Sequence, residues 1–143
     1  MHEPLDAFLL PRREFRDPRT GRLVWQVTDG DFECVAPYMD KPAWSRDDRF
    51  LFFMCNRSGA WQPYRLELST GRAQQLARDR NALFRSIVYS PALDEVFVED
   101  ADSYLAIRPE TLAARRAVDF RRLFGDGPGQ KGDAAVLSGD GRL

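Results

Sequence analysis

The chain has 143 residues, of which 30% are charged and 43% are apolar, so its length fits one domain with a packed core. The formal net charge is −1, which gives no basic field for nucleic acid or for an anionic membrane surface, and neither is expected as a partner. No apolar run approaches the length of a membrane span. The first residues also lack the basic and apolar regions of a signal peptide, so the expected location is the cytoplasm.

The first third of the chain contains one predicted strand. Residues 1–16 are polar with scattered apolar positions and two prolines, and they are expected to form a loose N-terminal arm. A turn is predicted at residues 17–22, where Gly21 can supply a positive φ. The β-branched and aromatic run at 23–28 predicts a strand, and an irregular loop is expected at 29–41.

Four short strands are predicted next, and together they make up a first blade at residues 42–77. The predicted strands are 42–45, 50–54, 61–68 and 72–77. The strand at 50–54 is apolar on both faces, as expected of a strand buried between two layers. The strand at 61–68 alternates, with Tyr64 and Leu66 on one face and Arg65 on the other.

The same pattern then recurs in a second predicted blade at residues 84–120. Its predicted strands are 85–90, 95–99, 103–108 and 112–120. A glycine-rich run at 125–133 predicts a loop, and residues 134–143 begin a third copy. The turn residues that mark the repeat are Ser45, Ser90 and Ser138 in one turn, and Thr20, Thr70 and Thr111 in another.

The repeat predicts an all-β fold of antiparallel, four-stranded propeller blades. A period of about 40 to 50 residues with four strands is typical of a propeller blade. Residues 17–143 would then form a partial propeller with about two full blades and flanking strands. Because propellers usually close with four to eight blades, the chain is expected to be the N-terminal part of a longer protein, with the strand at 23–28 completing its last blade. The alternative is a generic antiparallel meander or sandwich.

Between residues 17 and 120 the chain resembles the oligogalacturonate lyase family, and more loosely the Tol-type propeller repeats. The residues that carry the resemblance are Asp17-Pro18-x-Thr20-Gly21, Val27-Thr28, Cys34, Tyr38, Ser45-x-Asp47-Asp48-Arg49, Phe52-Phe53, Arg57-Ser58-Gly59, Tyr64-x-Leu66-x-Leu68-x-Thr70-Gly71 and Gln75-Leu76. The resemblance implies a seven-bladed propeller that splits short pectin fragments by β-elimination.

The resemblance also implies a metal-assisted mechanism. A divalent metal, manganese, held largely by histidines, would bind the uronate carboxylate while a histidine base removes a proton and an arginine stabilises the developing charge. In the family these groups come from later blades. This chain has one histidine, His2, in the expected arm. We therefore assign no catalytic residue and no metal ligand, and we expect no cofactor in this chain itself.

Three residues are candidates for binding an acidic oligosaccharide: Tyr38, Arg57 and Trp61. They lie in or beside loops that should emerge on one face of a propeller. The forked guanidinium of arginine suits carboxylates, and aromatic rings stack on sugar faces. The alternative is that Tyr38 and Trp61 pack the blade junction and that Arg57 is a solvated loop residue. Arg80 and Arg85 are weaker candidates.

Three functional hypotheses follow. The first is the N-terminal portion of an oligogalacturonate-lyase-like propeller, inactive alone. The second is a non-catalytic Tol-type or sensor-type propeller that binds a protein or a carbohydrate. The third is self-association of the chain through open blade edges. Cys34 and Cys55 match no metal motif in their spacing, and we expect two reduced structural thiols.

Overall fold

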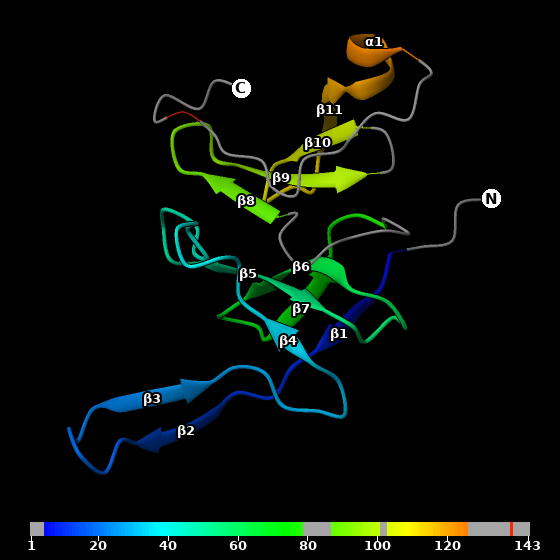
Figure 1. The fold of residues 1–143 in the computed structure, drawn as a ribbon. Helices are drawn as coiled ribbons and strands as arrows, with labels where there is room; N and C mark the ends of the chain where they lie inside the picture. The colour runs from blue at the N-terminus through cyan, green and yellow to red at the C-terminus, as the bar shows by residue number, and fades with distance from the viewer. Residues whose placement is uncertain (1–4, 79–86, 101–102, 126–137, 139–143) are drawn as a thin grey trace.

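The computed structural model describes residues 5–78, 87–100, 103–125 and 138. These residues form two larger antiparallel sheets, a two-stranded ribbon and a short helix. In Figure 1 one sheet lies above the other, and the ribbon of β2 and β3 projects from the lower sheet. The chain is thus all-β with antiparallel sheets, as expected for part of a propeller.

The lower sheet is the first blade, with strand order β1-β7-β6-β5-β4. Its strands are β1 (Ala7–Leu9), β4 (Cys34–Val35), β5 (Phe50–Cys55), β6 (Gln62–Glu67) and β7 (Arg72–Gln75). The predicted second, third and fourth strands of this blade are confirmed as β5, β6 and β7. Consecutive strands pair antiparallel because each pair is joined by a short turn.

The upper sheet is the second blade, with strand order β11-β10-β9-β8. Its strands are β8 (Ile87–Ser90), β9 (Glu95–Asp100), β10 (Ser103–Ile107) and β11 (Ala114–Asp119), and all four were predicted. The helix α1 (Phe120–Phe124) follows directly, and the Asp119 side chain caps it by accepting the Arg122 N–H. Within the described part of the chain no helix has the length and apolarity needed to cross a membrane. Apart from Ser138, the predicted third copy lies outside the described residues.

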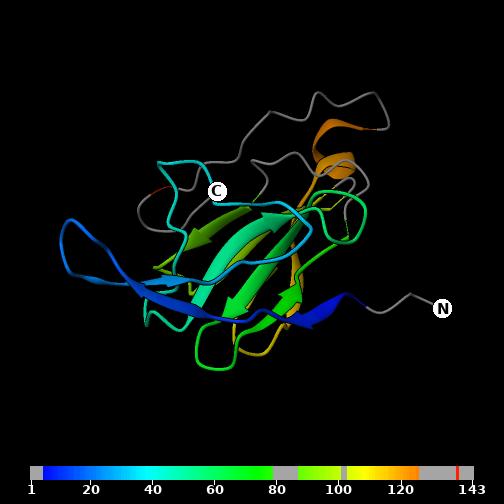
Figure 2. The same ribbon diagram turned by 90° about the horizontal axis from the view of Figure 1, so that it is seen from below.

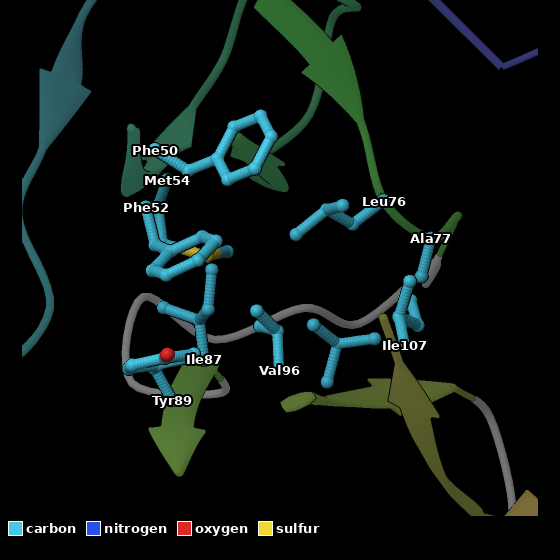
Figure 3. Close-up of a cluster of buried hydrophobic side chains, with 10 residues drawn as sticks. Phe50, Phe52, Met54, Leu76, Ala77, Ile87, Tyr89, Val96 and Ile107 are labelled. Carbon is cyan, nitrogen blue, oxygen red and sulfur yellow. The ribbon is translucent and has the colours of Figure 1, made fainter. Parts of the chain in front are cut away.

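The core that joins the two blades comes from one face of β5 and the facing strands of the second blade. Figure 3 shows these side chains pointing toward one another. The rings of Phe52 and Tyr89 stack with centroids 5.0 Å apart. The buried members are Phe50, Phe52, Met54, Leu76, Ala77, Ile87, Tyr89, Val96, Val98 and Ile107. The other face of β5 packs into a second cluster, formed by Leu10, Phe53, Cys55, Tyr64, Leu66 and Ala73. The apolar run at 50–54 is therefore buried on both faces, as predicted.

Local hydrogen bonds explain why the turn residues recur. Ser45 donates to Asp47 Oδ1 (2.7 Å), and its hydroxyl accepts the Phe50 N–H (2.9 Å). In the second blade the Ser90 hydroxyl accepts the Leu93 N–H (3.4 Å). These serines close the same turn in both blades by accepting from backbone amides five and three residues ahead, respectively.

The first blade departs from prediction at its inner edge. A strand was expected at 42–45, but the structure has a single bridge there, between Trp44 and Leu51. The inner edge is formed instead by β4, inside the segment expected to be an irregular loop, and β4 pairs with the end of β5. Residues 36–43 (the 36–43 loop) connect β4 to this bridge, and the last of them, Ala43, accepts the Phe52 N–H at 2.7 Å. Prolines occur near both ends of this loop, and proline cannot donate a ladder hydrogen bond.

The N-terminal segment also differs from the expected loose arm. β1 pairs antiparallel with β7 and becomes the outer strand of the first blade. β2 (Arg13–Arg16) pairs with β3 (Leu23–Gln26) as a ribbon. The expected role of β3 in completing a last blade stays a prediction. Figure 2 shows β1 along the edge of the blade and the ribbon extending beyond it. β1 docks because Phe8 and Leu10 pack on the second cluster. The sequence does not show this pattern, because the exposed residue between Phe8 and Leu10 is also apolar, Leu9.

Candidate functional site

The loop between β5 and β6 is held firmly at one end of the first blade. The Asn56 N–H donates to the Glu33 carbonyl oxygen (3.2 Å). In return, the Glu33 N–H donates to Asn56 Oδ1 (2.8 Å), and Asn56 Nδ2 donates to Glu33 Oε2 (3.3 Å). The start of the inner strand and the β5–β6 loop therefore lie together.

Arg57, in this loop, is bound by a residue of the N-terminal segment. Arg57 Nη1 donates to both carboxylate oxygens of Asp6, at 2.7 and 2.6 Å, and the Tyr64 hydroxyl donates to Asp6 Oδ2 at 3.0 Å. The guanidinium also lies over the Phe8 ring, 4.3 Å from its centroid. We call these residues the Asp6–Arg57–Tyr64 network. It joins the loop, β6 and the segment before β1.

The backbone of Asp6 is held as well. Its N–H donates to Gln75 Oε1 (3.0 Å), and its carbonyl oxygen accepts from the Gln75 N–H (2.9 Å) and from Gln74 Nε2 (3.1 Å). Charge-assisted bonds such as those from Arg57 are about twice as strong as neutral ones. The carboxylate is therefore fixed in position by both its side chain and its backbone.

The charge state of the network follows from these contacts. Partial burial by itself would raise the pKa of Asp6, but the hydrogen bonds from Arg57 and Tyr64 outweigh burial, and the net pKa lies below its usual value. The same bond to Asp6 raises the pKa of Arg57. Burial raises the pKa of Tyr64, and the bond to Asp6 raises it further. Asp6 and Arg57 are thus an ion pair, and Tyr64 is a neutral donor.

The structure separates the three predicted binding residues by environment. Arg57 is paired with Asp6 although its side chain remains 38% exposed, so a bound carboxylate would compete with Asp6 for it. Trp61 is partly buried against the interblade core, which favours the packing alternative for this residue. Tyr38 is 48% exposed in the 36–43 loop. Arg80 and Arg85 lie outside the described residues.

Two groups here were missed from the sequence: Asp6 and the cysteine pair. Asp6 was placed in a loose arm, although a short apolar run, Ala7 to Leu10, follows it directly. Cys34 and Cys55 are direct partners on β4 and β5, and both thiols are free. Nothing in their sequence spacing indicated this contact, because it depends on the register of two strands.

The described ranges do not fit a metal centre. Among them no group of three or more histidine, cysteine, aspartate or glutamate side chains is arranged to hold an ion. Manganese and similar hard cations need several oxygen or nitrogen ligands. His2 lies outside the described residues. We therefore derive no chemical step through a metal in this chain.

Comparison with solved structures agrees with this fold. An oligogalacturonate lyase in complex with manganese superposes with a TM-score of 0.66 at 27% identity over 80% of this chain. The chain is similar to oligogalacturonate lyase. An oligogalacturonate lyase from Vibrio parahaemolyticus superposes with a TM-score of 0.67 at 23% identity, also over 80% of this chain, which supports the fold. The resemblance inferred from the sequence is thereby confirmed.

This chain spans about a third of those lyases, since the matches cover 31% of each of them. No protein-family model matches the sequence, and no curated protein matches it either. The similarity therefore rests on the arrangement of two blades, not on a set of catalytic residues.

Proposed function

We propose that the chain is the N-terminal portion of an oligogalacturonate-lyase-like propeller, whose complete form cleaves oligogalacturonides by metal-assisted β-elimination. The observation that carries this proposal is the superposition on a manganese-bound oligogalacturonate lyase over 80% of the chain. Fold alone does not assign chemistry. The assignment therefore concerns the parent propeller, and the role of this portion is argued from its own residues.

The role of this portion is to form blade scaffold and one part of the substrate-facing loops. The Asp6–Arg57–Tyr64 network and the Glu33–Asn56 bonds fix the β5–β6 loop. Beside this loop, β4 leads into the 36–43 loop, where the exposed Tyr38 ring is suited to stacking on a sugar face. The metal ligands and the base would come from outside the described residues. The ligand class that this loop edge would take is an acidic oligosaccharide.

The proposal is tested by titrating the isotope-labelled chain with trigalacturonate and following amide shifts by NMR. We expect shifts concentrated in the 36–43 loop and in residues 55–61, and weaker shifts in Tyr38→Ala. Maltotriose, a neutral sugar, is the control and should leave both regions unchanged. Equal shifts with both sugars, or shifts confined to the β2–β3 ribbon, would contradict the proposed site.

A second measurement addresses catalysis directly. The chain is incubated with oligogalacturonides and manganese, and the ultraviolet absorbance of unsaturated uronate is recorded. We expect no product from these 143 residues, because their described part offers no group of metal ligands. Product formation would show that the chain holds a complete site. It would overturn the proposal that this portion supplies scaffold and loops while other residues supply the metal ligands and the base.

A further inference from the structure

Cys34 and Cys55 are opposed on neighbouring strands in a geometry that suits a disulfide. They are register partners of β4 and β5. The bond from the Asn56 N–H to the Glu33 carbonyl joins the residues that flank the pair, so the cysteines occupy a non-hydrogen-bonded position. At such positions Cα atoms lie about 4.5 Å apart, and disulfides bridge Cα separations from about 4.4 Å upward. A bond between the two sulfurs therefore requires little movement of either strand.

The surroundings of the pair make its two thiols unequal. The hydrogen bond from the Cys34 thiol lowers the pKa of Cys55, against the effect of burial, and the Arg57 N–H adds a second bond to Cys55 Sγ at 3.4 Å. The same thiol–thiol bond, together with burial, raises the pKa of Cys34. Because the Arg57 N–H donates to Cys55 Sγ, a thiolate on Cys55 is stabilised by this contact, with the Cys34 thiol beside it. A thiolate next to a second thiol is the arrangement of a nucleophile with its resolving group.

Access to the pair is through β4. Cys55 is fully buried, whereas Cys34 is half-buried on a strand of two residues at the edge of the sheet. Short edge strands open locally at a small cost in free energy compared with global unfolding. A small oxidant can therefore reach Cys55 without unfolding of the blade.

We propose that Cys34 and Cys55 form a reversible dithiol–disulfide site that is oxidised by a peroxide. The Cys55 thiolate attacks one peroxide oxygen, the O–O bond breaks, and hydroxide leaves, which gives a sulfenic acid on Cys55. The Cys34 sulfur then attacks the Cys55 sulfur. The S–S bond forms, the S–O bond breaks, and the departing hydroxide takes the Cys34 proton as water. A dithiol reductant reverses the process by thiol–disulfide exchange.

The proposed site goes beyond the carbohydrate function, and its test does not depend on that function. The disulfide would fasten β4 to β5, directly beside Arg57 and at the start of the 36–43 loop that carries Tyr38. Oxidation would thus fix the start of the 36–43 loop, which we propose to take part in sugar binding. This consequence concerns the mobility of the loop, whereas the test below measures the oxidation state of the two sulfurs directly.

The test treats the full 143-residue chain with a small excess of hydrogen peroxide and measures intact mass and free thiols after unfolding. We expect both thiols to disappear together, with a mass loss of two hydrogen atoms and full recovery on adding dithiothreitol. Trypsin can cut after Arg46 and Arg49, so the two cysteines fall in separate peptides, and these peptides should be linked only in the oxidised sample.

Two variants separate this site from general oxidation. In Cys34→Ser, a sulfenic acid should persist on Cys55 and be trapped by dimedone, because the resolving thiol is gone. In Cys55→Ser, Cys34 should stay unmodified under the same conditions. The proposal is overturned if the wild-type chain forms disulfide-linked dimers instead, if one thiol is oxidised without the other, or if both thiols survive. The wild-type result decides even where a variant folds poorly.

Discussion

β1 and the β2–β3 ribbon are neighbours in the sequence, yet only β1 is integrated into a blade. β1 pairs with β7, and the residues around it contribute Phe8 and Leu10 to the second cluster. In the ribbon, Phe15 is 50% exposed and Trp25 is 45% exposed. A two-stranded hairpin alone is marginally stable in water. Strand formation and docking onto the blade therefore have separate causes. The ribbon strands pair with each other without docking, whereas β1 docks because its pairing is accompanied by apolar burial and by the polar bonds of Asp6.

One glycine with positive φ lies in the β6–β7 turn beside the docked segment, and another lies in the ribbon turn, which gives a matched pair of substitutions. Gly71 has a φ of 71°, and a Cβ there would lie 2.7 Å from the Leu10 carbonyl oxygen. Gly21 has a φ of 67° with no atom within 4 Å of such a Cβ. The same residue type therefore meets the docked segment in one turn and open space in the other.

The largest expected effect is that of Gly71→Ala. The left-handed backbone costs about 1 to 2 kcal/mol for a residue with a Cβ, and displacing Leu10 raises the loss in unfolding free energy to about 2 to 3 kcal/mol. Gly21→Ala should change the global unfolding free energy by less than about 0.5 kcal/mol, since the ribbon adds little to the blades. Urea unfolding followed by tryptophan fluorescence and circular dichroism measures both. Equal losses would mean that the ribbon is as integrated as β1.

Asp6→Asn should have an intermediate effect that depends on pH. Hydrogen bonds to charged groups contribute about 1.5 to 3 kcal/mol; partial exposure of the pair reduces this to about 1 to 2 kcal/mol. Because the folded pKa of Asp6 lies below 3.8, the stabilisation is present above about pH 4. It is lost as the pH falls through the folded pKa.

The measurement is the unfolding free energy of the wild-type chain and of Asp6→Asn from pH 7 down to pH 2. The two curves should converge at the acid end. Asp17→Asn, in the ribbon turn, is the control and should leave the global unfolding free energy nearly unchanged at every pH. A constant difference between the wild-type chain and Asp6→Asn across this range would assign the loss to packing and not to the ion pair.

The smallest effect is expected for Trp25→Ala. The ring is half-exposed and stacks with Arg12, 4.2 Å from its centroid, away from both buried clusters. We expect a change within about 0.5 kcal/mol in the global unfolding free energy, together with faster amide exchange in β3. If Trp25→Ala lowers the global unfolding free energy as much as Asp6→Asn does, the ribbon is held to the blades by contacts beyond those of the half-exposed Trp25 ring.

The sequence predicts those parts of the fold that neighbouring residues encode. The alternation of Tyr64 and Leu66, the apolar run of β5 and the serine turns are local, so seven blade strands were placed correctly. The place of β1 was not predictable in this way, because its partner β7 lies far along the chain. The inner edge was missed for a related reason, since the 36–43 loop interrupts it.

The candidate site shows the same limit. Tyr38, Arg57 and Trp61 were singled out by residue type and loop position. Their surroundings in the structure differ because each residue contacts different parts of the chain that lie far away in the sequence. Asp6 reaches Arg57 only after β1 has docked, and Cys34 meets Cys55 only in one register of β4 on β5. Register and long-range pairing follow from the folded sheet, and the local pattern carries no signal for them.

The position of β1 has a consequence for how the chain folds during synthesis. The hydrogen bond between Asp6 and Gln75 spans 69 residues, so β1 leaves the ribosome long before its partner strand. At roughly 5 to 20 residues per second, the segment that carries Phe8 and Leu10 waits several seconds with its apolar side chains uncovered. The β5–β6–β7 meander, whose pairings are local, can assemble in that interval. Although β1 is translated before the other strands of its blade, it is thus the last of them to join it.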